Sequence, residues 1–252
     1  MIPPPPDGAL APRGGGPRGL PAVTFRWWEA ILLYLVVNVL LGGLVYVAIA
    51  GGREPGAARE IGAGLALDAV FLAAMVLWLR RAHPGSAEAI GTRSSRRVIA
   101  SGLGLGAILY AFVAFALAGG LTWVFDRLSS VPVEVPSQLP DHLGTVGGLL
   151  AVILAVVVAP VAEELYFRGI LYRSVRDPYG VGLGTAVSAG LFGLAHYVPA
   201  DGLGVWVLPL VMIVTGIALA QIYERSGTIV APIVTHMAFN AIGITLILSG
   251  IG

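Results

Sequence analysis

The chain has 252 residues, of which 57% are hydrophobic and only 12% are charged, and its mean hydropathy is +0.87. Since soluble domains average roughly 25% charged residues, this composition excludes an ordinary soluble protein and indicates a polytopic membrane protein. The net charge of +1 gives no reason to expect a nucleic-acid partner. The absence of cysteine excludes disulfides, thiolate metal ligands and cysteine nucleophiles.

The chain begins with a Pro- and Gly-rich stretch, residues 1–26, which is predicted to be a disordered tail. A helix that crosses a bilayer needs about 20 apolar residues. Seven segments approach or exceed that length: 30–50, 61–79, 98–125, 146–176, 181–196, 203–222 and 228–248. The predicted fold class is therefore all-α, a polytopic transmembrane helix bundle of about seven spans. Residues 126–145, with three prolines, are predicted to form an outer loop.

The arginines test this count of spans. With seven spans, one face carries the tail and the three loops or helix ends at 80–97, 164–179 and 223–227, which together hold 12 of the 15 arginines. The positive-inside rule then places the N-terminus in the cytoplasm and the C-terminus outside. The composition, with Arg but no Lys, looks bacterial, so the predicted location is a bacterial plasma membrane.

Two adjacent carboxylates and an arginine, Glu163, Glu164 and Arg168, lie at the end of the apolar run 146–162. Ionisable groups inside a span are costly to bury, so they are candidates for function. Glu164 and Arg168 have the i, i+4 spacing of a helical ion pair with the acid first. Glu163 points about 100° away from Glu164 and is free to face another helix.

Other polar residues should come to the same place. If residues 177–180 form a turn, Glu163 and His196 lie equally far from its centre, and in an antiparallel hairpin they share one depth. His236 and Asn240 share one face of the last span. We therefore predict a polar cavity between the last four spans, opening toward the cytoplasmic leaflet. Asp68, in the middle of the second span, could pair with Arg168 or reach water.

Each polar residue alone has a plainer interpretation. A single histidine in an apolar helix is more often a packing residue, and an asparagine is more often interhelical glue. A buried Glu–Arg pair could be a structural staple. The set as a whole is harder to assign to packing, because it places two glutamates, two histidines and an asparagine on three consecutive helices that carry polar residues. The set therefore favours a functional site.

The motifs Glu-Glu-x-x-x-Arg, Phe-x-x-x-His and His-x-x-x-Asn occur here in this order, over about residues 146–245. In this the chain resembles the CPBP family, the CAAX proteases and bacteriocin-processing enzymes also called Abi proteins. The resemblance implies an intramembrane endopeptidase acting on a membrane-associated protein or peptide, with residues 146–252 as its catalytic helix core and 27–145 as preceding spans and outer loop. Its implied site comprises catalytic Glu163, His196, His236 and Asn240, supported by Glu164, Arg168 and Phe192.

The chemistry of these residue types suits peptide hydrolysis. Glu163 can act as general base toward a water that His196 helps to hold. His236 and Asn240 can donate hydrogen bonds to the oxyanion of the tetrahedral intermediate.

Two alternatives stay open. The family is usually labelled metalloprotease, and zinc bound by Glu163, His196 and His236 is the rival to a metal-free site. The His-Glu-x-x-His spacing of zinc proteases is absent from the sequence, so no cofactor is the favoured prediction. The alternative function is that of a non-catalytic membrane scaffold or bacteriocin-immunity protein with the same fold. A proton-coupled transporter is a third possibility, although no internal repeat supports it.

Overall fold

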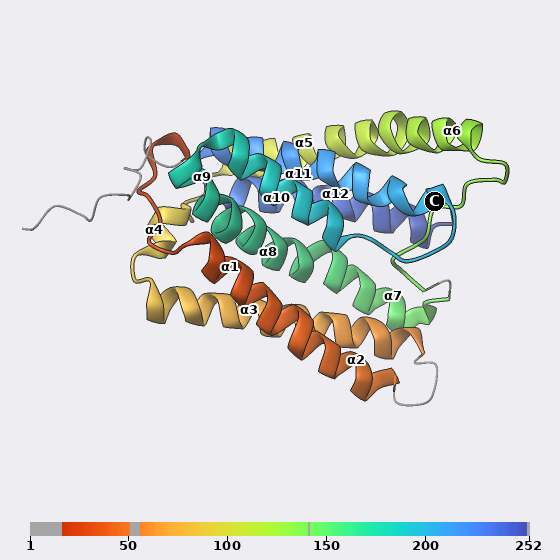
Figure 1. Cartoon of the computed structure of the whole chain (residues 1–252), viewed down its shortest axis with the longest axis horizontal. Helices are drawn as coiled ribbons and strands as arrows, with labels where there is room; N and C mark the ends of the chain where they lie inside the picture. The colour runs from red at the N-terminus through yellow and green to blue at the C-terminus, as the bar shows by residue number, and fades with distance from the viewer. Residues whose placement is uncertain (1–16, 51–55, 141, 251–252) are drawn as a thin grey trace, which may run out of the picture.

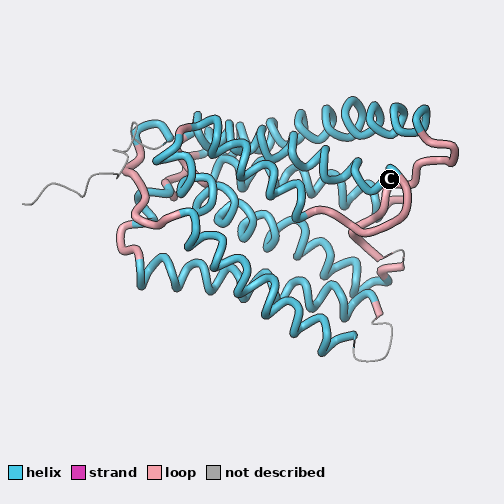
Figure 2. Tube along the Cα trace, in the orientation of Figure 1, coloured by secondary structure: helices cyan, strands magenta, loops and turns pink. Residues whose placement is uncertain are grey.

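The computed structural model describes residues 17–50, 56–140 and 142–250, and these residues fold into helices joined by short loops (Figures 1 and 2). Six of the described helical segments are long and apolar enough to cross a membrane, and a seventh, Val181–Ala195, is apolar but shorter. The prediction of a polytopic helical bundle is confirmed, and the chain is an integral membrane protein. Several helices change to π-helical geometry part-way along without a break. The elements in chain order are α1 (Trp27–Tyr34), η2 (Leu35–Leu41), α2 (Gly42–Ala50), α3 (Ala57–Ala82), α4 (Ser86–Ile90), α5 (Arg96–Ala111), η3 (Phe112–Ala118), α6 (Gly119–Leu128), α7 (Gly144–Val152), η4 (Ile153–Val158), α8 (Ala159–Glu164), η5 (Leu165–Tyr172), α9 (Arg173–Tyr179), α10 (Val181–Ala195), η6 (Leu203–Trp206), α11 (Val207–Ser226) and α12 (Val230–Leu248).

The outward surface of the bundle is apolar, as a lipid-facing surface must be. Large hydrophobic side chains are exposed along the helices, and Phe115 in the middle of its span is 77% exposed. Soluble monomeric proteins rarely expose so much contiguous apolar surface to water. Lipid tails can surround such a surface because they are themselves apolar. The backbone polar groups need no lipid partner, since each helix satisfies them internally.

The helix that carries the glutamates runs without interruption from Gly144 to Tyr179 and has 36 residues. At 1.5 Å per residue it is about 54 Å long, well beyond the roughly 30 Å of a hydrocarbon core. Its ends therefore reach past the hydrocarbon. The predicted turn at 177–180 is reduced to Gly180, whose φ of 95° is easily reached only by glycine, and α10 begins at the next residue.

The helices alternate in direction, so the bundle has two distinct ends (Figure 1). At one end α4 and the end of α9 meet residues 17–26 and the link between α11 and α12: Ile229 N–H donates to the Gly91 carbonyl at 2.8 Å. We call this the arginine-rich end. Its described arginines are Arg18, Arg26, Arg80, Arg81, Arg93, Arg96, Arg97, Arg173, Arg176 and Arg225. The opposite end, called the far end, holds the starts of α3 and α7, loop residues 129–140 and the end of α12.

The described part of the N-terminal tail is fixed to the arginine-rich end. The Val23 N–H donates to Asp177 at 3.0 Å, Arg173 donates to the Pro21 carbonyl at 2.6 Å, and Phe25 is buried. This differs from the disorder predicted for the whole of residues 1–26; residues 1–16 lie outside the described part. The composition of the tail could not reveal these hydrogen bonds, because the tail contributes backbone groups to them rather than side chains.

Close helix packing positions the second half of the bundle. A Cβ at Gly193 of α10 would lie 2.6 Å from the Pro209 carbonyl oxygen of α11, so only glycine allows these helices to approach so closely. Small residues at helix contacts serve the same purpose in membrane bundles generally. Gly193 lies three residues before His196, so this contact fixes the position of the end of α10 and of the His196 side chain relative to α11.

Candidate active site

Glu164 is fully buried and is held by two partners. Arg168 Nη1 donates to Glu164 Oε1 at 2.7 Å, and His236 Nδ1 lies 3.0 Å from the same oxygen. The predicted i, i+4 pair is therefore present in the structure, on successive turns of the helix. Glu164 thus ties the fourth span to α12 as well as to its own helix.

Arg168 is also fully buried, and its planar guanidinium joins several elements. Nη2 donates to the Gly216 carbonyl of α11 at 3.2 Å, and the guanidinium carbon lies 4.4 Å from the centre of the Phe192 ring. The cation over the ring face adds an electrostatic attraction to the packing. The Asp68–Arg168 pair considered from the sequence is not among these contacts, because Glu164 takes that place.

Glu163 faces away from this pair, as its position one residue earlier in the helix predicts. Its side chain is 27% exposed, and Oε2 lies 3.9 Å from His236 Nε2. That oxygen is buried and has no hydrogen-bond partner among the described residues. A gap of this size is too long for a direct hydrogen bond and suits a bridging water. The two adjacent glutamates therefore differ: Glu164 binds Arg168 and His236 through Oε1, whereas Glu163 is not within hydrogen-bond distance of either. Oε2 of each glutamate is buried without a partner among the described residues.

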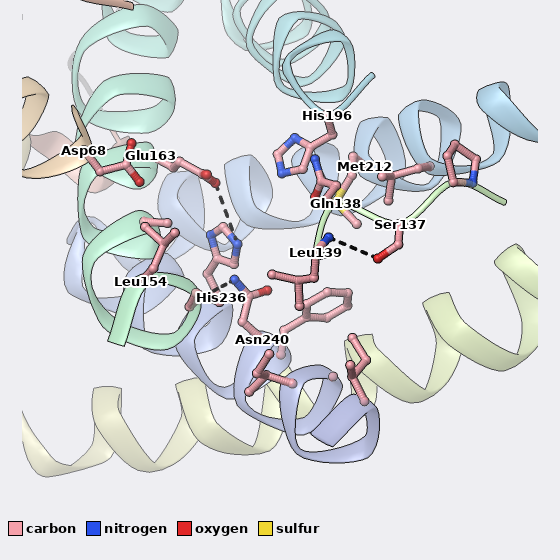
Figure 3. A pocket seen from close by; sticks show the side chains of 18 residues that line it. Asp68, Ser137, Gln138, Leu139, Leu154, Glu163, His196, Met212, His236 and Asn240 are labelled. Atoms are coloured by element: carbon pink, nitrogen blue, oxygen red, sulfur yellow. Dashed lines mark hydrogen bonds and ion pairs between the residues drawn. The ribbon is translucent and has the colours of Figure 1, made fainter. Parts of the chain in front are cut away.

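His236 lies between the two glutamates, with Nε2 3.9 Å from Glu163 and Nδ1 3.0 Å from Glu164. Figure 3 shows its contact with Glu163. A carboxylate can only accept hydrogen bonds, so the contact with Glu164 places a proton on His236 Nδ1. In the neutral ring Nε2 is then the unprotonated nitrogen, and it points toward Glu163. Glu164 thereby fixes both the orientation and the tautomer of the imidazole, as a carboxylate partner of histidine commonly does.

His196 is the first residue after α10 and is held by its own helix end. Its Nδ1 donates to the Phe192 carbonyl at 2.7 Å, since a carbonyl can only accept, which leaves Nε2 for other bonds. The fully buried Phe192 ring packs against both imidazoles, with ring centres 4.6 Å from His196 and 5.9 Å from His236. Phe192 is therefore a spacer that holds the two histidines apart.

Asn240 lies one turn beyond His236 on α12. Its Nδ2 donates one hydrogen to the Ala155 carbonyl of η4 at 2.8 Å. Because a carbonyl must face an N–H, this bond also fixes which side of the amide is nitrogen. The second hydrogen on Nδ2 remains available to another acceptor.

Glu163, His196, His236 and Asn240 all line one cavity of about 470 Å³ (Figure 3). The predicted convergence of these four residues is thus present in the geometry. Asp68 of α3 also lines the cavity, beside Glu163, so the walls extend beyond the last four spans. The other lining residues are Pro136, Ser137, Gln138, Leu139, Leu154, Ala155, Ala159, Leu208, Met212, Phe239, Gly243, Ile244 and Ile247.

No feature of the sequence indicated that loop residues Pro136–Leu139 line the cavity. Polar and proline residues are ordinary in any loop, so Ser137 and Gln138 carried no signal. Asp68 did carry one, as an ionisable residue in the middle of a span.

The cavity extends from Glu163 toward the far end, where Leu139 and Ile247 line it. The prediction that it opens toward the leaflet of the arginine-rich end is therefore wrong. The hairpin argument fixed only the depth of Glu163 and His196 relative to the turn at Gly180. It could not show that α9, α4 and residues 17–26 pack across the arginine-rich end.

The zinc alternative does not fit the arrangement of the side chains. Among the described residues, no group of three or more His, Asp or Glu side chains is placed to hold a metal ion.

A comparison with protein families agrees with this geometry. Residues 145–242 match the family model described as type II CAAX prenyl endopeptidase Rce1-like. Residues 145–242, here called the CPBP segment, are thus similar to the CAAX proteases of the CPBP family. The CPBP segment contains all seven motif residues from Glu163 to Asn240, whereas Asp68 and the loop Pro136–Leu139 lie outside it. A search of curated proteins and a search of solved structures each gave no significant match.

Proposed function

We propose that this chain is an intramembrane endopeptidase that hydrolyses a peptide bond of a membrane-associated protein or peptide. The observation that carries the proposal is the unpartnered Glu163 carboxylate oxygen in a cavity that also holds two histidines and an asparagine, all inside the CPBP segment. Hydrolysis needs a base for water and a donor for the oxyanion, and this cavity offers both.

The reaction starts from a water bonded to Glu163 and to an imidazole nitrogen. Glu163 takes a proton from the water while the water oxygen forms a bond to the carbonyl carbon of the substrate. The carbonyl oxygen becomes an oxyanion, to which the second N–H of Asn240 donates. When the intermediate collapses, the carbon–nitrogen bond breaks and Glu163 returns the proton to the departing amine. Acid and amine products leave with Glu163 ionised again.

The histidines position the water and the oxyanion. His196 presents Nε2 to the cavity, where it can accept a hydrogen from the water while Glu163 accepts the other. His236 presents Nε2 at 3.9 Å from Glu163 and can exchange a proton with the reacting groups during the cycle. Once protonated at Nε2, it becomes a second donor to the oxyanion.

Glu164, Arg168 and Phe192 have a supporting role in this mechanism. Glu164 holds the His236 ring through Nδ1, and Arg168 neutralises Glu164 in a site from which water is excluded. Such partners orient the groups that react without touching the substrate, as the carboxylate behind a catalytic histidine does in other hydrolases. No step in this scheme requires a metal ion.

The proposal is tested by mapping new peptide termini in membranes and medium of cells that produce the full chain. The three proteins compared are wild type, Glu163→Gln, and Glu60→Gln as a matched control at an exposed glutamate of α3 that does not line the cavity. We expect cleavage products with wild type and Glu60→Gln that disappear with Glu163→Gln. Identical peptide sets in all three would show that the fold works without glutamate chemistry, as a scaffold or immunity protein.

A further inference from the structure

The two ends of the bundle differ strongly in charge. The arginine-rich end holds ten of the described arginines, whereas the far end holds Arg59 and Arg127. The difference persists when Arg173 and Arg176, which pair with Asp177 and Glu224, are set aside. Positively charged loops are retained in the cytoplasm, so the arginine-rich end is the cytoplasmic one.

The arginine-rich end is also filled by packed polar groups. Arg173 is fully buried and donates to Asp177 at 3.0 Å and to the backbone carbonyls of Ala89 and Pro21. Tyr223 donates to the Ile90 carbonyl at 2.7 Å. These bonds join α9, α11, α4 and the N-terminal segment across the end of the bundle. A polypeptide that approached Glu163 from this side would have to break them.

The far end instead forms the mouth of the cavity. Loop residues 129–140 form a wall there: a Cβ at Gly204 would lie 1.8 Å from the Glu134 carbonyl oxygen, so η6 and these residues are in tight backbone contact. Asp126 accepts from the Val133 N–H at 2.8 Å, and Leu139 packs against the buried cluster of Ile61, Ala151 and Ile244. Between these anchors the exposed side chains of Ser137 and Gln138 line the cavity.

We propose that the substrate enters from the far end, and that the protein therefore cleaves polypeptide segments on the non-cytoplasmic side of the membrane. This inference rests on the proposed endopeptidase function and specifies its substrate class. The mouth beyond the catalytic groups is mostly apolar, with Leu139, Ile244 and Ile247 on its walls. The bound segment accordingly carries apolar side chains next to the cleaved bond, and Ser137 and Gln138 supply polar contacts to its backbone.

The absence of native cysteine makes the direction of access directly measurable. Three single-cysteine variants of the full chain are produced in a bacterial plasma membrane: Ser137→Cys in the cavity wall, Ser130→Cys on the same loop outside the cavity lining, and Ser94→Cys at the arginine-rich end. Each is treated in spheroplasts with a charged, membrane-impermeant maleimide, before and after the membrane is permeabilised. Labelling is read as the modified fraction of the purified protein.

We expect Ser137→Cys and Ser130→Cys to react in intact spheroplasts, and Ser94→Cys to react only after permeabilisation, with at least a tenfold difference in labelling. The opposite pattern would place the mouth in the cytoplasm and overturn the proposal. Labelling of Ser130→Cys without Ser137→Cys would also overturn it, because the cavity would then be closed from that side.

The labelling outcome does not depend on catalysis, so it separates this inference from the proposed function. If Glu163→Gln leaves all peptide products unchanged, the endopeptidase proposal fails whichever side is labelled. If products disappear with Glu163→Gln but map to cytoplasmic segments, the endopeptidase proposal stands and the proposed direction of substrate entry is wrong. We expect the lost products to map to non-cytoplasmic segments with apolar residues beside the cut.

Discussion

Replacing each of the two adjacent glutamates by glutamine should separate catalysis from stability. Glu164→Gln removes the counter-charge of a fully buried guanidinium, which lies 2.7 Å from the carboxylate. Breaking one partner of a buried ion pair destabilises by about 3–5 kcal/mol. With about 2–4 °C of melting temperature per kcal/mol for a chain of this size, Tm should fall by roughly 6–20 °C.

Glu163→Gln provides the matched comparison one residue away. Glu163 has no arginine partner, its side chain is 27% exposed, and its distance of 3.9 Å to His236 Nε2 is longer than a direct hydrogen bond. An amide is no harder to bury than a carboxylate. We expect Tm to stay within about 4 °C of wild type, equivalent to roughly 1 kcal/mol. Peptide cleavage should nevertheless fall by about 10²–10⁴-fold, the usual effect of losing a general base.

The assay is thermal unfolding of the purified proteins in one detergent, together with turnover of a peptide found by the terminus mapping. A third variant tests this reason: adding Arg168→Met to Glu164→Gln removes the unpaired buried charge and should recover part of the lost Tm, because a neutral pair leaves no charge without its partner. Equal Tm losses for Glu163→Gln and Glu164→Gln, or no recovery with Arg168→Met, would refute the division of roles between the two glutamates.

Three further outcomes are expected. Asn240→Ala should lower the turnover rate by about 10²–10³-fold, as for a removed oxyanion donor, with a smaller effect on KM; an unchanged rate would remove Asn240 from the mechanism. Strong chelators should leave turnover within about twofold of untreated enzyme, whereas loss of activity that added zinc restores would establish a metal site that the side chains must rearrange to form. Gly193→Ala should destabilise by about 1–3 kcal/mol and reduce turnover, because its methyl group would meet the Pro209 carbonyl 2.6 Å away. Gly190→Ala, with nothing within 4 Å on the same helix, is the control and should be neutral or slightly stabilising in unfolding experiments.

The sequence by itself determined the helical bundle and was enough to single out the residues of the candidate site. Long apolar runs can cross a bilayer only as helices, since each backbone group must be satisfied within its segment. Ionisable residues inside such runs stand out because burying them is costly, which is why Glu163, Glu164 and Arg168 could be found without a structure. Helical periodicity was enough to pair Glu164 with Arg168 and to turn Glu163 away from them.

Only the tertiary structure decided which of these groups bond to one another and which other segments line their cavity. That Glu164, rather than Glu163, holds His236 Nδ1 depends on how α12 is rotated against the fourth span, and periodicity within one helix carries no information about that rotation. The place of loop residues 136–139 in the cavity wall depends on the backbone contact between Glu134 and Gly204, far along the chain. The closed arginine-rich end arises in the same way, because Arg173 bonds to the carbonyls of distant segments, and every segment offers such carbonyls whatever its side chains.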